Sequence, residues 1–328
     1  MLRFLKRIGI DTYMLLLLAT VVLGLVLPAR GLAALGLGQI TYWAVALLFF
    51  IYGAKLDPSS VKAGMLNWRL QGLSFIATYV LFPLLGLAIA FVFGDLLGPQ
   101  VTMGLLFLSV LPSTVQSSIA FVSMAGGNVP AAICSASLSN MLGVVLTPTL
   151  AALVLHAGDG GVSLDAIIRI GSQILLPFIL GQVLRPWVGG FVKSRKMLTL
   201  VVDRGAILLI VYSAFGAGTV SGLWASIPPA SLIALIAVVL VFLALVFGVI
   251  AGTGRLFRLP MQDRSVLFFC GSTKSLASGL PIAAALFPPE TVGAVVLPVM
   301  VYHMSQLLIC AMIAQHSARR NEQQALVA

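Results

Sequence analysis

Long apolar runs, separated by short polar or glycine- and proline-containing stretches, fill almost the whole chain of 328 residues. A run of about 17 or more mostly apolar residues is long enough to cross the hydrocarbon core of a bilayer as a helix. The pattern predicts an all-α membrane protein with ten transmembrane helices, near residues 11–28, 39–54, 70–93, 101–125, 129–155, 165–185, 200–220, 231–253, 265–287 and 291–315. We expect one membrane domain over residues 1–328, ending in a polar cytoplasmic tail at 316–328.

The composition favours lipid as the main solvent of the protein. The chain is 60% hydrophobic and only 9% charged, whereas a soluble protein carries about 25% charged residues. The net charge of +10 comes from basic residues between the apolar runs, without the interleaved aromatic residues of a nucleic-acid surface. We therefore expect the lipid bilayer as a partner and no nucleic acid. Cys134, Cys270 and Cys310 lie within apolar runs without metal-ligand spacing, so no metal site is expected.

The basic residues also predict the orientation of the helices. With the N-terminus in the cytoplasm, the inside segments hold 16 of the 19 Lys and Arg residues, and the outside segments hold only Arg30 and Arg169. The remaining one, Lys274, falls inside a predicted helix. Because positive residues collect in cytoplasmic loops, both termini are predicted to be cytoplasmic, in a plasma membrane such as the inner membrane of a bacterium.

Weak sequence echoes relate the first five predicted helices to the last five. Tyr52-Gly53-Ala54 is echoed by Tyr212-Ser213-Ala214, and Ser113-Thr114 by Ser272-Thr273, at offsets of 160 and 159 residues. An odd number of helices in each half turns the second half over in the membrane. We therefore expect two inverted repeats, an arrangement found in secondary transporters, at about 11–155 and 165–315.

Polar stretches interrupt two of the predicted helices. The fourth helix contains Pro112, which removes a backbone donor and clashes with the preceding turn, followed by a hydroxyl-rich segment at 113–118. The ninth helix contains Gly271-Ser272-Thr273-Lys274-Ser275. Hydroxyls of this kind also line ordinary contacts between membrane helices. Discontinuous helices at matching places in two halves, however, indicate the binding site of a transporter.

Lys274 is the strongest candidate for a functional residue within these stretches. An ammonium at the middle of a bilayer costs at least about 2.5 kcal/mol. No Asp or Glu is predicted at that depth within a helix, because Asp11, Asp165 and Asp203 fall at the ends of predicted helices. Two interpretations stay open: the substrate is the counter-ion of Lys274, or Lys274 needs no substrate because it is neutral or is satisfied by carbonyls of the broken helices. The candidate substrate- or ion-binding residues are Ser113, Thr114, Gln116, Ser117, Ser118, Ser139, Asn140, Ser272, Thr273, Lys274, Ser275, His303 and Gln306.

The sequence resembles the bile acid:sodium symporter superfamily in this helix pattern, in the break at Pro112, in Gly127-Asn128-Val129 and in Ser278-Gly279-Leu280. Residues 111–140 are especially similar to the SBF-like branch that includes sodium/bile acid cotransporter 7, and the resemblance covers essentially the whole chain. It implies a panel of helices 1, 2, 6 and 7, and a core of helices 3–5 and 8–10 in which helices 4 and 9 cross. It also implies a secondary active transporter that binds a small solute, expected to be an organic anion, between panel and core, with alternating access.

The sequence departs from this family at the sodium-binding positions. The resemblance aligns Ser272 with a glutamate that binds both sodium ions, and aligns Leu276 and Ala277 with a glutamine and an asparagine. Two hydroxyl positions of helix 5 fall on Ala132 and Ala136. Because sodium prefers hard oxygen ligands, ideally including an anionic one, sodium coupling is doubtful.

Lys274, two residues after the lost carboxylate position, suggests a replacement for sodium. We hypothesise that its fixed ammonium supplies the sodium charge, so that transport is uniport, exchange or proton-coupled. No cofactor is expected beyond Na⁺ or H⁺ as a coupling ion. The sequence leaves three other functions open: a membrane regulatory protein with a transporter fold and no coupled flux, a channel, and an intramembrane enzyme. The enzyme would use Ser272, Ser275 or Ser278 as nucleophile and Lys274 as base; residues this close along a regular helix do not face one another, and we expect no enzyme.

Overall fold

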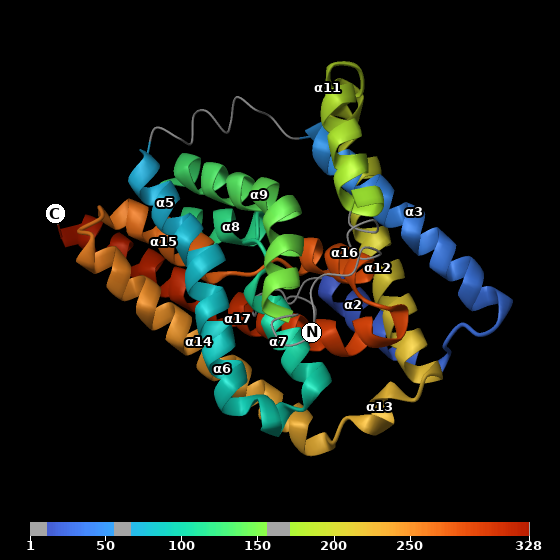
Figure 1. Cartoon of the computed structure of the whole chain (residues 1–328). Helices are drawn as coiled ribbons and strands as arrows, with labels where there is room; N and C mark the ends of the chain where they lie inside the picture. The colour runs from blue at the N-terminus through green and yellow to red at the C-terminus, as the bar shows by residue number, and fades with distance from the viewer. Residues whose placement is uncertain (1–11, 56–66, 156–170, 328) are drawn as a thin grey trace.

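The computed structural model describes residues 12–55, 67–155 and 171–327, and this part of the chain is helical without strands (Figure 1). Eight helical segments are long and apolar enough to cross a membrane: Leu32–Lys55, Trp68–Leu97, Val129–Leu155, Ser172–Val192, Met197–Val220, Pro229–Leu256, Met261–Leu286 and Pro289–Arg320. Two shorter apolar helices are Leu15–Val26 and Pro99–Ser109. The all-α membrane class is therefore confirmed, while the count of ten spans stays a prediction.

The helices have the following bounds in chain order. They are α2 Thr12–Val26, α3 Leu32–Lys55, α5 Trp68–Ile76, α6 Phe82–Leu97, α7 Pro99–Ser109, α8 Gln116–Met124, α9 Val129–Leu155, α11 Leu176–Ser194, α12 Lys196–Val220, α13 Leu223–Ser226, α14 Pro229–Leu256, α15 Met261–Ser272, α16 Leu276–Leu286 and α17 Pro289–Val327. Two π-helical turns, Ala77–Leu81 and Gly171–Leu175, lead directly into α6 and α11.

The helices can be divided by their contacts into two groups, which meet mainly where α12 packs against α17. Helices α2, α3, α11 and α12 pack together, and we call them the panel group. Helices α5 to α9 and α14 to α17 form the core group. Figure 1 shows α11 lying along α3, and glycines explain how closely they approach: a Cβ on Gly181 would overlap the carbonyl of Phe50, and one on Gly53 would overlap the carbonyl of Phe178. Small residues allow such close helix contacts in membrane proteins.

Three aromatic rings from separate helices mark the centre of the core group. Phe82 of α6, Phe242 of α14 and Tyr302 of α17 are fully buried. Their ring centroids lie 5.5 Å (Phe82 to Phe242), 6.0 Å (Phe82 to Tyr302) and 5.9 Å (Phe242 to Tyr302) apart. Tilted and edge-on ring pairs of this kind stabilise beyond the area that they bury. This cluster lies directly beside the broken helices described below.

The observed helix ends differ from the predicted ones where polarity and helix propensity disagree. The helix predicted at 291–315 extends over Pro289–Val327, so residues 316–327 of the predicted tail continue α17. These residues are polar but include Ala, Arg, Gln and Glu, with neither glycine nor proline, and they favour helix without an apolar face. The helix predicted at 165–185 ends at Ser194, and its first residues lie outside the described part of the chain.

Candidate functional site at the crossing of two broken helices

The two predicted interruptions are present, and they lie against each other. Helix α7 ends at Ser109 and α8 begins at Gln116, with Pro112 in the non-helical segment between them. Helix α15 ends at Ser272, and residues 273–275 lead into α16. The amide of Ser275 donates to the carbonyl of Pro112 at 2.8 Å. This hydrogen bond joins the backbones of the two breaks.

A cluster of hydroxyls from both breaks surrounds Thr273. The Thr273 Oγ1 lies 3.1 Å from the Ser113 Oγ, 3.0 Å from the Thr114 Oγ1 and 2.8 Å from the Ser118 Oγ. It also donates to the carbonyl of Phe269 at 2.9 Å. These hydroxyls replace backbone partners that the unwound segments lack, which is how irregular backbone is tolerated at membrane depth.

Helix α9 ties the two breaks together from the side. The amide of Ser113 donates to the Ser139 Oγ at 3.0 Å, and Asn140 Nδ2 donates to the carbonyl of Ser113 at 2.7 Å. The other end of the Asn140 side chain accepts from the Ser278 hydroxyl at 2.7 Å. Asn140 therefore connects the first break to the first turn of α16 through one side-chain amide.

Lys274 is fully buried, and its ammonium is held by the protein itself. Nζ donates to the carbonyls of Thr78 at 2.9 Å, Ser109 at 2.9 Å and Leu111 at 2.6 Å. It also lies 3.9 Å from the centroid of the Phe82 ring, which adds a cation–π contact. Of the two interpretations left open by the sequence, the geometry favours satisfaction by backbone carbonyls.

Each of the three carbonyls is available for a physical reason. In the π-helical turn the amide of Phe82 bonds the carbonyl of Ala77. The next carbonyl, that of Thr78, would need an amide at residue 83, and residue 83 is proline. The carbonyls of Ser109 and Leu111 lie at the end of α7, where helix carbonyls lose their partners and the helix dipole is negative. A cation is the natural partner for this set.

Helix α17 completes the second break. Gln306 holds the peptide of Lys274 at both ends, because its Oε1 accepts from the Lys274 amide at 2.7 Å and its Nε2 donates to the Lys274 carbonyl at 2.8 Å. His303 Nδ1 lies 2.8 Å from the Gln306 Nε2. The Tyr302 hydroxyl donates to the carbonyl of Ser272 at 2.8 Å. Three side chains within about one turn of α17 therefore hold the geometry of the break.

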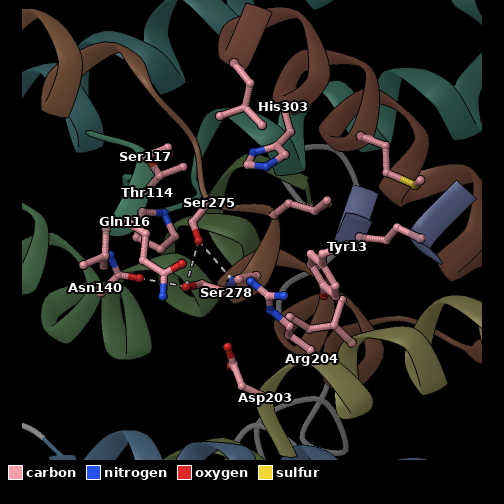
Figure 2. A pocket seen from close by; sticks show the side chains of 18 of the residues that line it. Tyr13, Thr114, Gln116, Ser117, Asn140, Asp203, Arg204, Ser275, Ser278 and His303 are labelled. Carbon is pink, nitrogen blue, oxygen red and sulfur yellow. Dashed lines mark hydrogen bonds between the residues drawn. The ribbon is translucent and has the colours of Figure 1, made fainter. Parts of the chain in front are cut away.

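A cavity of about 1160 Å³ lies between the panel group and the core group (Figure 2). Six of the thirteen predicted site residues line it: Thr114, Gln116, Ser117, Asn140, Ser275 and His303. The other seven are not among its lining residues, and their hydrogen bonds place them at or behind the crossing: Ser113, Ser118, Ser139, Ser272, Thr273, Lys274 and Gln306. The predicted residues thus divide into a cavity surface and a supporting layer.

The charged residues of the cavity come from helices that carry none of the thirteen predicted site residues. Asp203 and Arg204 of α12 line it, as do Tyr13 and Tyr52. The Tyr52 hydroxyl donates to Asp203 Oδ1 at 2.6 Å, and the Arg204 guanidinium lies 4.8 Å from the centroid of the Tyr13 ring.

These residues were missed because the helix was predicted to begin at residue 200. Helix α12 begins at Lys196, which places Asp203 and Arg204 two turns inside it. One feature of the sequence indicates these two residues as candidates: an acidic and a basic residue follow Val201 and Val202 at the edge of an apolar run.

The intramembrane enzyme considered from the sequence needs the Lys274 amine beside a serine hydroxyl. The structure turns this amine toward three backbone carbonyls instead. The Ser272 hydroxyl donates to the carbonyl of Phe268 in its own helix, at 2.5 Å. Neither arrangement pairs a nucleophile with a base.

Comparison with known proteins identifies the family. The sequence matches the SBF-like CPA transporter family over residues 11–319. The chain belongs to this family. It is 47% identical to the uncharacterized protein PA2026 of Pseudomonas aeruginosa over 95% of this chain and 94% of that protein. It is 42% identical to the putative symporter YfeH of Escherichia coli over 96% of this chain and 95% of that protein. Mouse sodium/bile acid cotransporter 7 is 26% identical over 82% of this chain and 80% of that protein.

Membership in the SBF-like CPA transporter family, together with the apolar helices, makes this an integral multi-pass membrane protein of transporter type. The resemblance stated from the sequence is thereby confirmed. The three residues for which the sequence resemblance implies lost sodium ligands, Ser272, Ala132 and Ala136, are fully buried. The described residues at these positions are uncharged.

Proposed function

We propose that the protein is a secondary transporter that moves a small organic anion across the bacterial inner membrane by alternating access of the panel group against the core group. The observation that carries the proposal is the cavity of about 1160 Å³, which is lined from both groups and reaches both helix breaks. A cavity of this size can enclose a drug-sized solute. The proposal includes ten spans in two inverted halves, with both termini in the cytoplasm.

Contacts between the groups support an inward-facing state. The cavity extends to Lys55 and Arg204, which the distribution of basic residues assigns to the cytoplasmic side. Elsewhere, Trp224 of α13 stacks on Phe215 of α12 with centroids 5.1 Å apart. The same ring packs against Gly293 of α17, where a Cβ would lie 2.9 Å from it. This packing closes panel against core, and we propose that it separates in the outward-facing state.

The ammonium of Lys274 supports transport without sodium. A cation held by three carbonyls at the crossing occupies the kind of oxygen site that a bound metal ion would otherwise occupy. We propose that this fixed charge takes the electrostatic role of sodium in the crossing. Transport is then uniport, exchange or coupled to protons.

Uptake into proteoliposomes tests the proposal. The full chain is reconstituted, and uptake of cholate and of 2-naphthoate is measured with and without an inward sodium gradient, with protein-free liposomes as the control. We expect uptake above the control that is unchanged by sodium. Uptake that requires the sodium gradient would contradict the coupling proposal. Binding of either solute without any flux would instead support a membrane regulatory protein with a transporter fold.

A further inference from the structure

Among the described residues, the positive charge that faces the cavity comes from the panel group and not from the crossing. Lys274 is absent from the cavity lining, and its Nζ is bonded to three carbonyls. The core side of the cavity presents uncharged polar groups, including Asn140, Ser275 and Ser278. Figure 2 shows the side chains of Asp203 and Arg204, both from α12, among those that line the cavity with these residues.

Two features leave the Arg204 guanidinium available to a ligand. Its neighbour Asp203 accepts a 2.6 Å hydrogen bond from Tyr52, and within the described part of the chain no ion pair joins Arg204 to a carboxylate. The Arg204 guanidinium lies over the Tyr13 ring at 4.8 Å. Stacking on a ring orients a guanidinium and leaves its edge donors directed outward.

The other lysine or arginine of the lining in the described part of the chain, Lys55, is less suited to anion recognition. Lys55 is the last residue of α3 and is exposed, whereas Arg204 is half-buried. An exposed ammonium stays strongly hydrated, while a planar guanidinium presents paired donors that match the two oxygens of a carboxylate. Arg204 is therefore the cation whose geometry selects for a carboxylate.

We infer that Arg204 is the anion-binding residue of the cavity and pairs with the carboxylate of an amphipathic organic acid. The apolar body of the acid lies along Phe49, Phe178 and Phe215, which line the same cavity. Its polar groups face Ser275 and Ser278 across the cavity. The inference rests on the proposed function, because it names the part of the substrate that the panel group recognises.

A substrate held in this way touches both moving groups. Its carboxylate is bound by α12 of the panel group, and its far end by the first turn of α16 in the core group. A bound acid also neutralises the cation that would otherwise be enclosed when panel and core close around it, and enclosing an unpaired charge is costly. The Arg204 pairing therefore favours closure with substrate over closure without it.

Binding to the purified full chain tests this inference with three compounds that share one apolar body: 2-naphthoate, 2-naphthamide and 2-naphthyltrimethylammonium. We expect the wild type to bind the acid at least about tenfold more tightly than the amide, and the cation most weakly. Arg204→Gln is expected to weaken binding of the acid at least about tenfold, while the affinity for the amide changes less than about twofold. Arg204→Lys keeps the charge but not the paired donors, so its affinity for the acid should lie between those of the wild type and Arg204→Gln.

The control variant is Arg69→Gln, which removes an exposed arginine of α5 that does not line the cavity. It should bind all three compounds like the wild type. Equal affinity of the wild type for acid and amide, or unchanged acid binding by Arg204→Gln, would overturn the inference. Equal loss of acid and amide binding in both Arg204 variants would overturn it too, because it would indicate a structural role.

These binding outcomes are separate from flux. Acid preference through Arg204 without uptake into proteoliposomes would refute transport and keep the subsite. Uptake without acid preference would support transport and refute the Arg204 subsite.

Discussion

The Nζ of Lys274 donates to the carbonyl of Thr78 at 2.9 Å, in the turn where Pro83 removes the amide that this carbonyl would otherwise accept. The two residues are 196 positions apart in the sequence. A proline in one helix and a lysine in the break of another thus form one unit. The lysine ammonium supplies the donor that the proline lacks.

This unit predicts energetic coupling between residues 83 and 274. Lys274→Met should lower the free energy of unfolding by at least about 2 kcal/mol, because several buried carbonyls lose their donor at roughly 1–3 kcal/mol each. Pro83→Ala introduces an amide at residue 83. In the Lys274→Met background this amide can donate to Thr78, so the double variant should regain part of the loss.

Thermal unfolding of the four proteins in detergent measures this double-mutant cycle. If the effects of the two substitutions on the free energy of unfolding are additive, the predicted coupling between residues 83 and 274 is refuted. Lys274→Arg keeps a buried cation of different shape. The difference between its free energy of unfolding and that of the wild type measures how closely the three carbonyls fit an ammonium.

A second prediction concerns Asp263, which joins the beginnings of three core helices. Its two oxygens accept from Asn128 Nδ2 at 3.0 Å and from Asn67 Nδ2 at 3.2 Å. Each asparagine also caps its own helix, α9 or α5, by accepting from an amide of the first turn. The carboxylate lies in the first turn of α15, where the helix dipole favours an anion.

Asp263→Ala should therefore lower the free energy of unfolding by about 1–3 kcal/mol, because the two amide donors lose a charged acceptor. Asn128→Asp should also destabilise, by placing a second carboxylate against the first. Exchanging the pair, with Asn128→Asp and Asp263→Asn together, should recover part of this loss. Apparent melting temperatures of the single and double variants test the prediction, and an exchanged protein no more stable than Asn128→Asp alone would refute it.

A third prediction concerns Asn140, which connects the two breaks. Asn140→Ala removes the donor to the Ser113 carbonyl and the acceptor of the Ser278 hydroxyl. We expect uptake of the proteoliposome probes to fall at least about tenfold, because the relative position of reacting or binding groups is sensitive to shifts of about 1 Å. Ser137→Ala is the matched control, since Ser137 lies on the same helix and also lines the cavity. Similar uptake by both variants would show that the connection is not needed.

A fourth prediction tests the contact between α3 and α11. Gly181→Ala places a methyl group where the Phe50 carbonyl lies, and α3 must move away. We expect a loss of about 1–3 kcal/mol in the free energy of unfolding, as for other overpacked sites. Gly190→Ala lies on the same helix with no atom within 4 Å of the added Cβ, and should be neutral or stabilising by up to about 1 kcal/mol. Equal stability of the two variants would contradict the close contact.

The sequence alone determined the features that depend on local chemistry. Apolar runs predicted membrane helices, because their length matches the bilayer. Pro112 and the glycine- and hydroxyl-rich segment around Thr273 predicted the two breaks, because proline lacks a donor and such residues tolerate irregular backbone. Asn140 and Gln306 are candidates because each lies close to another polar residue of its predicted helix, Ser139 or His303. Family resemblance was also readable from local motifs such as Gly127-Asn128-Val129.

Only the tertiary structure decided which way the polar side chains face and what they bind. Lys274 finds its acceptors 163, 165 and 196 residues away, at Leu111, Ser109 and Thr78. Arg204 and Asp203 line the cavity on α12, a helix that packs against both α2 and α17. No local pattern encodes these partners, since the direction of a side chain in the membrane depends on which other helices pack against it. The sequence thus identified the polar residues, and packing divided them into a substrate-facing surface and its support.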